Sequence, residues 1–416
     1  MTTPKETTFD IPVVSDAEII DRVLSADGGI LRMAPAWVPR AFCTPGRRLR
    51  LHPDDYYPFE KGRGGIDERW IASTIRADNG PGTGPYEGLS LAVGPDGAAL
   101  VPLDEIVARG GADVVGERLW TKFGGWTAYA KFFDNLFPLP FHVHAPDEKA
   151  AAVGKFGKPE AYYYPPQMNN YLGTQSVSYL GLRPDVTKDD LRDFLEAHSQ
   201  GGDNKITELS YGYRTQLGTG WDIPAGVLHA PATVCTYEPQ AASDVLSMFE
   251  SWSNNAEVPD ELLWKDVPAE RHGDHDVLID LVDWDINADP NFRENRAMIP
   301  FETERSKACD GTDFVEKWIV YRSMHFSAKE LTVRPGRSVT LTEADAYGAI
   351  AVGGHGTING LELAAISMVR INDLTRDEYF VTARAAQGGV TITNSSDVED
   401  LVVLKNYGPG NVELGL

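Results

Sequence analysis

The chain has 416 residues, of which 42% are hydrophobic and 24% are charged. These proportions are ordinary for a soluble globular protein and exclude disordered and fibrous classes, and the length predicts two or three domains. There are 38 Lys and Arg residues against 61 Asp and Glu residues, a net charge of −23. So negative a surface repels phosphate backbones and anionic lipid, so we expect no nucleic-acid partner and no membrane partner.

The three cysteines, Cys43, Cys235 and Cys309, lie far apart and form no CxxC motif. A disulfide scaffold or a cysteine-ligated zinc site is therefore not expected, and we predict a cytoplasmic protein. The first sixteen residues lack the apolar segment of a signal peptide, and no uninterrupted apolar window is long enough to cross a bilayer.

Forty glycines and 27 prolines divide the chain into short segments, many of which are typical of β-strands. Such segments, separated by turn signals, predict β-sandwich or barrel domains. Two helices are also expected. Ser15 precedes an apolar stripe and is followed three residues later by Glu18, which predicts a capping box at the start of a helix. Thr187 opens the second helix, over residues 187–198, with acidic residues in its first turn.

An acidic segment with two prolines and no strand pattern, residues 254–276, predicts a domain boundary. Strand character returns near residue 315. The expected division is an N-terminal extension with a helix (1–29), a first β domain (30–255), an acidic connection (256–309) and a second β domain (310–416).

His142 and His144 stand two residues apart in the segment FPLPFHVHAPDEKA. If this segment is a strand, both imidazoles point to the same face and form half of a metal site. A pair of surface histidines would give the same pattern, so the pair alone does not decide the matter.

Two further segments supply candidate ligands. Glu160, in GKFGKPEAYYY, would share a strand face with Tyr162 and Tyr164, and His229 follows the turn in IPAGVLHAP. Three histidines and one glutamate from separate strands would enclose one divalent metal ion and leave room for a substrate oxygen.

The segments FHVHAPDEKA, GKFGKPEAYYY and IPAGVLHAP, in this order, resemble the type I phosphomannose isomerases (mannose-6-phosphate isomerases) of the cupin superfamily. The resemblance extends over nearly the whole chain. It implies an all-β fold with minor helices, made of two cupin barrels of the jelly-roll type. The first barrel would carry a helical insertion and the metal, and the second would carry no metal.

The resemblance also implies roles for individual residues. His144, Glu160 and His229 match the zinc ligands of that family, and His142 stands where the family has glutamine. Imidazole is a stronger donor than an amide oxygen, so the site should still bind metal. Zinc is the first expectation for the cofactor, with Fe, Mn, Co or Ni as alternatives, because three histidines and one glutamate are the common ligand set of cupins in general.

Two catalytic candidates come from the same resemblance. Lys158 matches a lysine implicated at the family's active site, and Glu238 matches an acid downstream of His229. Glu238 is the candidate general base, because a carboxylate buried beside a metal is tuned for proton abstraction next to a carbonyl. A structural acid that supports a loop is the alternative for Glu238.

Met248 departs from the family, which has an arginine at this position close to the substrate and its phosphate. A thioether cannot pair with phosphate. Either another cation replaces the arginine, or the substrate lacks the phosphate, or the protein is not an isomerase. Arg183, Lys205 and Arg214 are candidate replacements in the same domain.

The functional hypothesis is a metal-dependent aldose–ketose isomerase that moves a proton between C1 and C2 through a cis-enediol(ate). Its substrate would be mannose-6-phosphate/fructose-6-phosphate or a related sugar, with or without phosphate. Two alternatives stay open: a non-catalytic sugar-binding cupin, and an Fe-dependent cupin oxygenase. The sequence does not predict the oligomeric state.

Overall fold

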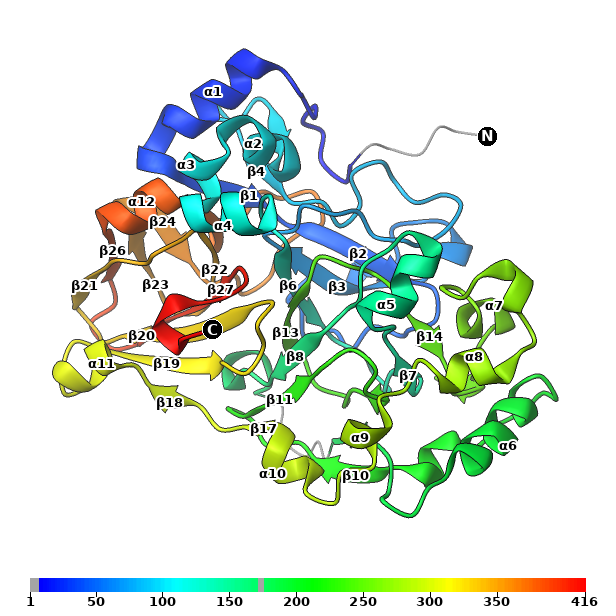
Figure 1. The fold of residues 1–416 in the computed structure, drawn as a ribbon. Helices are drawn as coiled ribbons and strands as arrows, with labels where there is room; N and C mark the ends of the chain where they lie inside the picture. Colours follow the sequence, from blue (N-terminus) through cyan, green and yellow to red (C-terminus); the bar gives the residue numbers. More distant parts are fainter. Residues whose placement is uncertain (1–6, 171–175) are drawn as a thin grey trace.

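The computed structural model describes residues 7–170 and 176–416. Strands predominate, the helices are short, and the strands pair in antiparallel fashion (Figure 1). This confirms the expectation of a mostly β fold with minor helices.

Two sheets of the first half face one another and hold the candidate site between them. The larger sheet contains, in spatial order, β17 (Ala297–Met298), β11 (Gly220–Ile223), β8 (Glu160–Tyr163), β13 (Thr236–Ala241), β6 (Ala128–Phe133), β3 (Gly65–Ile71) and β2 (Ala36–Arg40). The facing sheet contains β10 (Tyr211–Arg214), β9 (Val177–Leu180), β12 (His229–Ala230), β7 (His142–Val143) and β14 (Ser247–Met248).

The central strand β6 explains how the larger sheet separates two environments. Its sequence AYAKFF is buried along its whole length, so both of its faces are covered. Because side chains alternate along a strand, Lys131 and Phe133 point toward the facing sheet, and Ala130 and Phe132 point the other way. Ala130 and Phe132 belong to the core that joins the two halves of the molecule.

A second pair of sheets forms the other half. The longer one contains β18 (Phe301–Glu302), β19 (Phe314–Val320), β20 (Ser327–Val333), β27 (Leu401–Tyr407), β22 (Tyr347–Gly353), β25 (Glu378–Val381), β1 (Ile30–Ala34), β4 (Leu91–Val93) and β5 (Leu100–Pro102). The shorter one contains β21 (Ser338–Leu341), β26 (Val390–Asn394), β23 (His355–Ile358) and β24 (Leu361–Ala364). A small separate hairpin consists of β15 (Trp252–Ser253) and β16 (Ala256–Glu257).

The two halves share strands as well as a core. Strand β1 pairs with β25, and β4 pairs with β1, so segments near the start of the chain extend the sheet of the second half. The predicted division at residues 30, 256 and 310 stays a prediction. Short helices, α7 to α10, occupy much of the predicted acidic connection.

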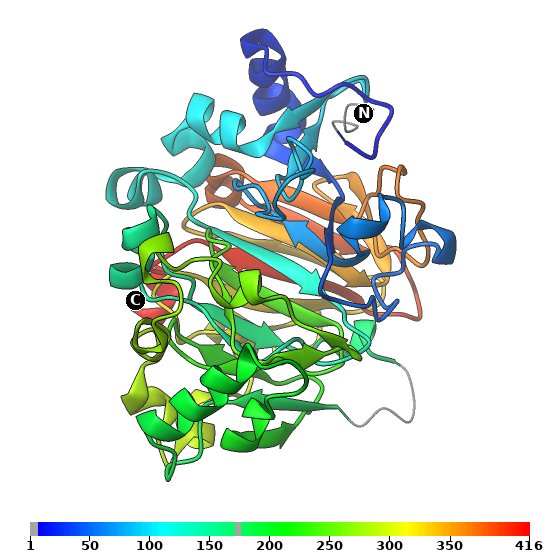
Figure 2. The ribbon, with the colours of Figure 1, turned by 90° about the vertical axis from the view of Figure 1, so that its right-hand side faces the viewer.

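The helices lie around the sheets. They are α1 (Ala17–Ser25), α2 (Leu103–Gly110), α3 (Ala112–Val115), α4 (Glu117–Phe123), α5 (Asp147–Ala150), α6 (Lys188–His198), α7 (Asp260–Leu263), α8 (His275–Ile279), α9 (Trp284–Asn287), α10 (Phe292–Arg296), α11 (Glu304–Ala308) and α12 (Ala383–Gly388). Helices α1 and α6 lie at opposite ends of the molecule in both views (Figure 1 and Figure 2). No helix of the described residues is long and apolar enough to cross a bilayer.

The two predicted helices exist, but the predicted capping box at Ser15 is wrong. Thr187 precedes α6 as expected, and the structure shows that it forms a capping box with Asp190. Helix α1 is capped by Asp16, whose carboxylate accepts hydrogen bonds from the backbone N–H groups of residues 18 and 19. Ser15 donates instead to Glu105 at 2.6 Å, a partner that is distant in the sequence.

Candidate metal centre and active site

Three histidines converge between the facing sheets of the first half. His142 lies on β7 and His229 directly opposite on β12, and His144 follows β7 immediately. Their ring centroids are 4.0 to 5.0 Å apart. One nitrogen from each ring lies within 4.8 Å of the other two, so the group could hold a metal ion.

The alternation of β7 explains why these rings point inward. Phe141 and Val143 flank His142 and are buried on the opposite face, in a core shared with Leu191 and Leu195 of α6. The cost of exposing these apolar side chains therefore fixes the orientation of His142.

Glu160 meets the histidines from the opposite sheet. One carboxylate oxygen lies 2.9 Å from Nε2 of His144, and the other lies 3.1 Å from Nε2 of His229. Tyr162, two residues along β8, donates its hydroxyl to the same carboxylate at 2.7 Å. The glutamate side chain is buried.

Backbone carbonyls set the tautomer of all three rings. Nδ1 of His142, His144 and His229 lies 2.7 to 2.8 Å from a backbone oxygen in each case. A carbonyl only accepts, so each Nδ1 carries the proton and each Nε2 presents a lone pair to the centre. Burial lowers the pKa of His142 well below its usual value and lowers that of His144 to about 3, so both rings are neutral near pH 7.

The two contacts between Glu160 and the Nε2 atoms of His144 and His229 each join two hydrogen-bond acceptors with no proton between them. Nε2 of His229 faces a Glu160 oxygen and has no hydrogen-bond donor among the described residues. Nδ1-protonated histidines supported by backbone oxygens, with a carboxylate beside them, are a typical ligand set for zinc and similar divalent ions. The residues present therefore fit a divalent metal.

Lys158 and Glu238 lie at the edge of this group. The Lys158 ammonium is 3.0 Å from Glu160 and 3.8 Å from Glu238. Burial raises the pKa of Glu238 well above its usual value, and the negative charge of Glu160 adds to the effect. Burial alone would also raise the pKa of Glu160, but the ammonium of Lys158 holds it well below its usual value.

A buried chain of ion pairs continues from Glu238, and the sequence analysis missed it. Lys131 contacts Glu238 at 3.3 Å and Glu68 at 3.0 Å. Arg40 contacts Glu68 at 3.1 Å and donates two hydrogen bonds to Asp244. The sequence did contain a signal for this chain of ion pairs. Lys131 is the only charged residue in the strand AYAKFF, and a lone charge in an apolar strand indicates a buried ion pair.

None of the proposed replacements for an arginine at position 248 reaches the site. Met248 is buried opposite His142 and packs in an apolar cluster with Leu246 and Val258. Arg183 is bound to Asp185 and to a backbone oxygen near α6. Lys205 and Arg214 are exposed.

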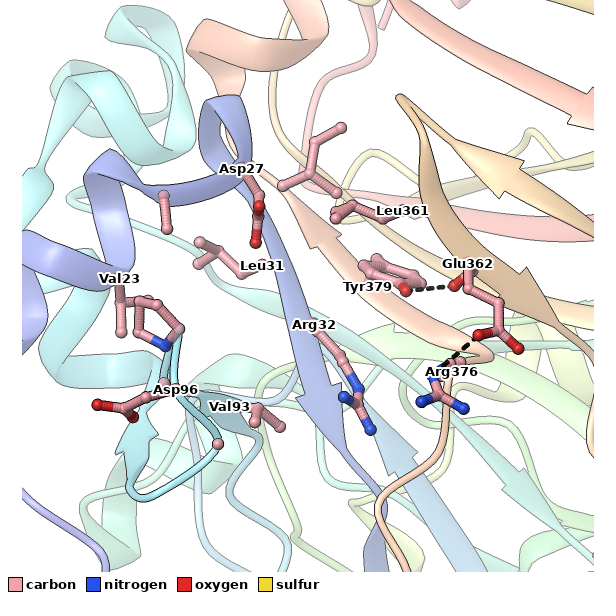
Figure 3. Close-up of a pocket in the computed structure, with 15 residues that line it drawn as sticks. Val23, Asp27, Leu31, Arg32, Val93, Asp96, Leu361, Glu362, Arg376 and Tyr379 are labelled. Atoms are coloured by element: carbon pink, nitrogen blue, oxygen red, sulfur yellow. Dashed lines mark hydrogen bonds and ion pairs between the residues drawn. The ribbon is translucent and has the colours of Figure 1, made fainter.

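A separate pocket of about 350 Å³ contains none of these residues. It is formed by α1, β1, the turn between β4 and β5, and the strands β24 and β25. Figure 3 shows its arginines, Arg32 and Arg376, with Arg376 paired to Glu362 at 3.2 Å. We assign this pocket no part in the chemistry of the histidine site.

No family model matches the sequence, and no curated protein matches it. Solved structures do match. A mutant of the phosphomannose isomerase from Salmonella typhimurium has a TM-score of 0.62 at 11% identity, over 92% of this chain and 100% of that chain. The mannose 6-phosphate isomerase from Bacillus subtilis has a TM-score of 0.58 at 15% identity, over 91% of this chain and 99% of that chain. This chain has the phosphomannose isomerase fold. The resemblance expected from the three sequence motifs is thereby confirmed for the fold.

Proposed function

We propose that this protein is a metal-dependent aldose–ketose isomerase that interconverts an aldose and its ketose by moving a proton between C1 and C2. The observation that carries the proposal is the convergence of three buried imidazoles and one carboxylate beside a second buried acid, Glu238. The shared fold with phosphomannose isomerases supports it. Mannose-6-phosphate, or a related sugar with or without phosphate, is the expected substrate.

His142, His144, Glu160 and His229 would hold the metal. Zinc is the first expectation, since three imidazoles and one carboxylate suit it, with Fe, Mn, Co or Ni as alternatives. When bound, such an ion supplies Lewis-acid polarisation of the sugar carbonyl.

Glu238 is the proposed general base. Its carboxylate would take the proton from one carbon and return it to the neighbouring carbon of a cis-enediol(ate). A raised pKa brings a carboxyl group closer to the operating pH, which favours both transfers. Lys131, 3.3 Å away, would orient this carboxylate.

Lys158 is the proposed electrostatic partner. Its ammonium lies between Glu160 and Glu238, so it would donate a hydrogen bond to the oxygen on which negative charge develops. A donor fixed in a buried site stabilises such a charge more strongly than water does.

We further propose two cupin barrels, over residues 30–255 and 310–416, of which the first holds the metal; β1, β4 and β5 of the first range extend a sheet of the second barrel. The cytoplasmic location stays part of the proposal and agrees with the free thiols of Cys43, Cys235 and Cys309. The expected partner is a small sugar or sugar phosphate.

One experiment tests the proposed activity. The metal content of the purified protein is measured, and the metal-loaded protein is then incubated in D2O with mannose and with mannose-6-phosphate. Deuterium at C1 or C2, or ketose formation, is the expected result. His144→Ala should lose both metal and exchange, and the matched variant His355→Ala, at an exposed position of β23, should keep both.

Other outcomes would overturn the proposal in distinct ways. Copurified iron with oxygen uptake and no exchange would indicate a cupin oxygenase. Tight sugar binding by the metal-loaded protein without exchange would indicate a non-catalytic sugar-binding protein.

A further inference from the structure

A pocket of about 670 Å³ lies in the first half of the molecule, and none of the proposed metal ligands lines it. Leu246 and Val258 line it and belong to one apolar cluster with Met248, and Phe42, which also lines it, packs against that cluster. Met248 is the strand partner of His142, so its side chain lies on the same face of the sheet as that imidazole. Met248 therefore links the apolar cluster at the pocket wall to the proposed metal ligand.

A second contact joins the pocket to the site. Arg40 lines the pocket and is bound to Glu68, which in turn is bound to Lys131. Lys131 contacts Glu238, the proposed base. The pocket wall is thus continuous with the buried ion pairs of the active site.

Each positive charge along this pocket already has a carboxylate partner. Both terminal nitrogens of Arg40 donate hydrogen bonds to the carboxylate of Asp244, at 3.0 and 3.2 Å. Lys265 lies 3.3 Å from Asp78, and Arg63 is paired with Glu87. Among the described residues that line the pocket, no cationic group is left unpaired.

Carboxylates also face the pocket directly. Asp78, Glu257 and Glu261 line it, and all three are exposed. A phosphate dianion is held by charge-assisted hydrogen bonds, most often from arginine, and is repelled by nearby carboxylates. Uncharged sugar hydroxyls can donate to carboxylates, so the same lining suits a neutral polyol.

We propose that this pocket receives the end of the sugar distant from the carbonyl, and that the substrate is an unphosphorylated aldose. This inference rests on the proposed isomerase function. Met248 joins the apolar cluster at the pocket wall to His142, so the proposal requires this side chain to change rotamer before the reacting carbons reach the site. The unbranched thioether of methionine is well suited to such movement.

The test compares two sugars by turnover and by binding. The metal-loaded protein is assayed for kcat/KM with mannose and with mannose-6-phosphate, and the affinity for each is measured by calorimetry. We expect kcat/KM and affinity to be at least about 10-fold higher for mannose, and millimolar inorganic phosphate not to inhibit. Tighter binding of the phosphate ester, or inhibition by inorganic phosphate, would overturn the inference.

The binding measurement separates this inference from the isomerase proposal. If neither sugar is turned over, the proposed function fails. A preference for mannose in binding still supports the neutral pocket in that case, and a preference for mannose-6-phosphate contradicts it.

Variants give a second route to the same question. Met248→Arg introduces a cation without a carboxylate partner, and we expect the affinity for mannose-6-phosphate to rise by about 10-fold or more. Met248→Leu is the matched control and should bring no gain. Because position 248 is buried, Leu262→Arg, at a half-buried position of the same pocket, tests the same effect if Met248→Arg does not fold. If neither arginine variant gains affinity for mannose-6-phosphate, the lack of a free cation is not what excludes phosphate, and the inference is contradicted.

Discussion

Each half of the molecule buries a cluster of charges between its two sheets, and the two clusters differ in one respect. In the second half, Lys405 contacts Glu316 at 2.5 Å and Glu343 at 2.9 Å, and Lys329 contacts Glu343 at 3.1 Å. Arg305 and Glu413 complete this cluster, in which three basic groups face three carboxylates.

The cluster of the first half has an excess of acceptors. Its basic members among the described residues are Lys158, Lys131 and Arg40, and its acidic members are Glu160, Glu238, Glu68 and Asp244. The Nε2 atoms of the three histidines, whose Nδ1 atoms face backbone oxygens, add to that excess. Buried ion pairs alone therefore do not identify a functional site, since a cluster in which every buried charge has a partner can be purely structural. The surplus of acceptors indicates where a further cation belongs.

The largest expected difference between the clusters is catalytic. Glu238→Gln should lower kcat by about 10²- to 10⁴-fold, the usual loss when a general base is removed. Glu316→Gln, the matched change in the second cluster, should leave kcat of the folded protein unchanged. Steady-state kinetics of the two metal-loaded variants decide between these outcomes, and full kcat in Glu238→Gln would remove Glu238 from the mechanism.

The second cluster should matter for stability. Lys405→Met removes the ammonium nearest to Glu316 and leaves Lys329 as the remaining fully buried cation for Glu316 and Glu343, which should lower the free energy of unfolding by about 3–5 kcal/mol. Lys317→Met, at a half-buried position of neighbouring β19, should change it by no more than about 0.5 kcal/mol. Urea denaturation measures both values, and equal stability of the two variants would contradict a structural role for the cluster.

A carboxyl group between the two halves should make stability depend on pH. Burial raises the pKa of Glu378 to about 7, although Arg69 lies 2.9 Å away. The folded protein therefore retains a proton that the unfolded chain loses above its usual pKa of 4.5. Stability should fall as the pH rises from 4.5 to 7, by up to about 3 kcal/mol.

Glu378→Gln removes this titration, so its stability relative to the unsubstituted protein should rise between pH 5 and pH 7.5. Urea denaturation of both proteins at the two pH values measures the change. An identical pH dependence in the two proteins would show that Glu378 does not titrate in this range.

The smallest expected effect concerns matched hydrogen bonds in the two clusters. Tyr407 donates to Glu343 at 2.9 Å, and Tyr162 donates to Glu160 at 2.7 Å. Tyr407→Phe should lower the free energy of unfolding by about 1.5–3 kcal/mol, the usual contribution of a hydrogen bond to a charged group. Tyr162→Phe should mainly weaken metal binding, by about 10-fold or more, because the hydroxyl of Tyr162 orients Glu160, a proposed metal ligand.

Metal titration and urea denaturation of both tyrosine variants check this pair. If Tyr407→Phe altered metal affinity as much as Tyr162→Phe, the two clusters would not be functionally distinct.

Local spacing in the sequence determined several features. The two-residue period of a strand is enough to predict that His142 and His144 share a face, and that Tyr162 lies on the same side as Glu160. The acidic residues that follow Thr187 are enough to predict that a helix begins there. These features depend on residues close together in the chain, and the structure has each of them.

Only the tertiary structure decided which distant residues meet. Arg40, Glu68 and Lys131 join Glu238 because β2, β3, β6 and β13 are neighbours in one sheet, and that order does not follow from any single strand. Asp16 rather than Ser15 caps α1, and Ser15 donates its hydroxyl to Glu105 of α2, a contact that local spacing does not predict. Local propensity acts over a few residues, whereas strand order and register are set by burial of the whole apolar surface, which no local pattern contains.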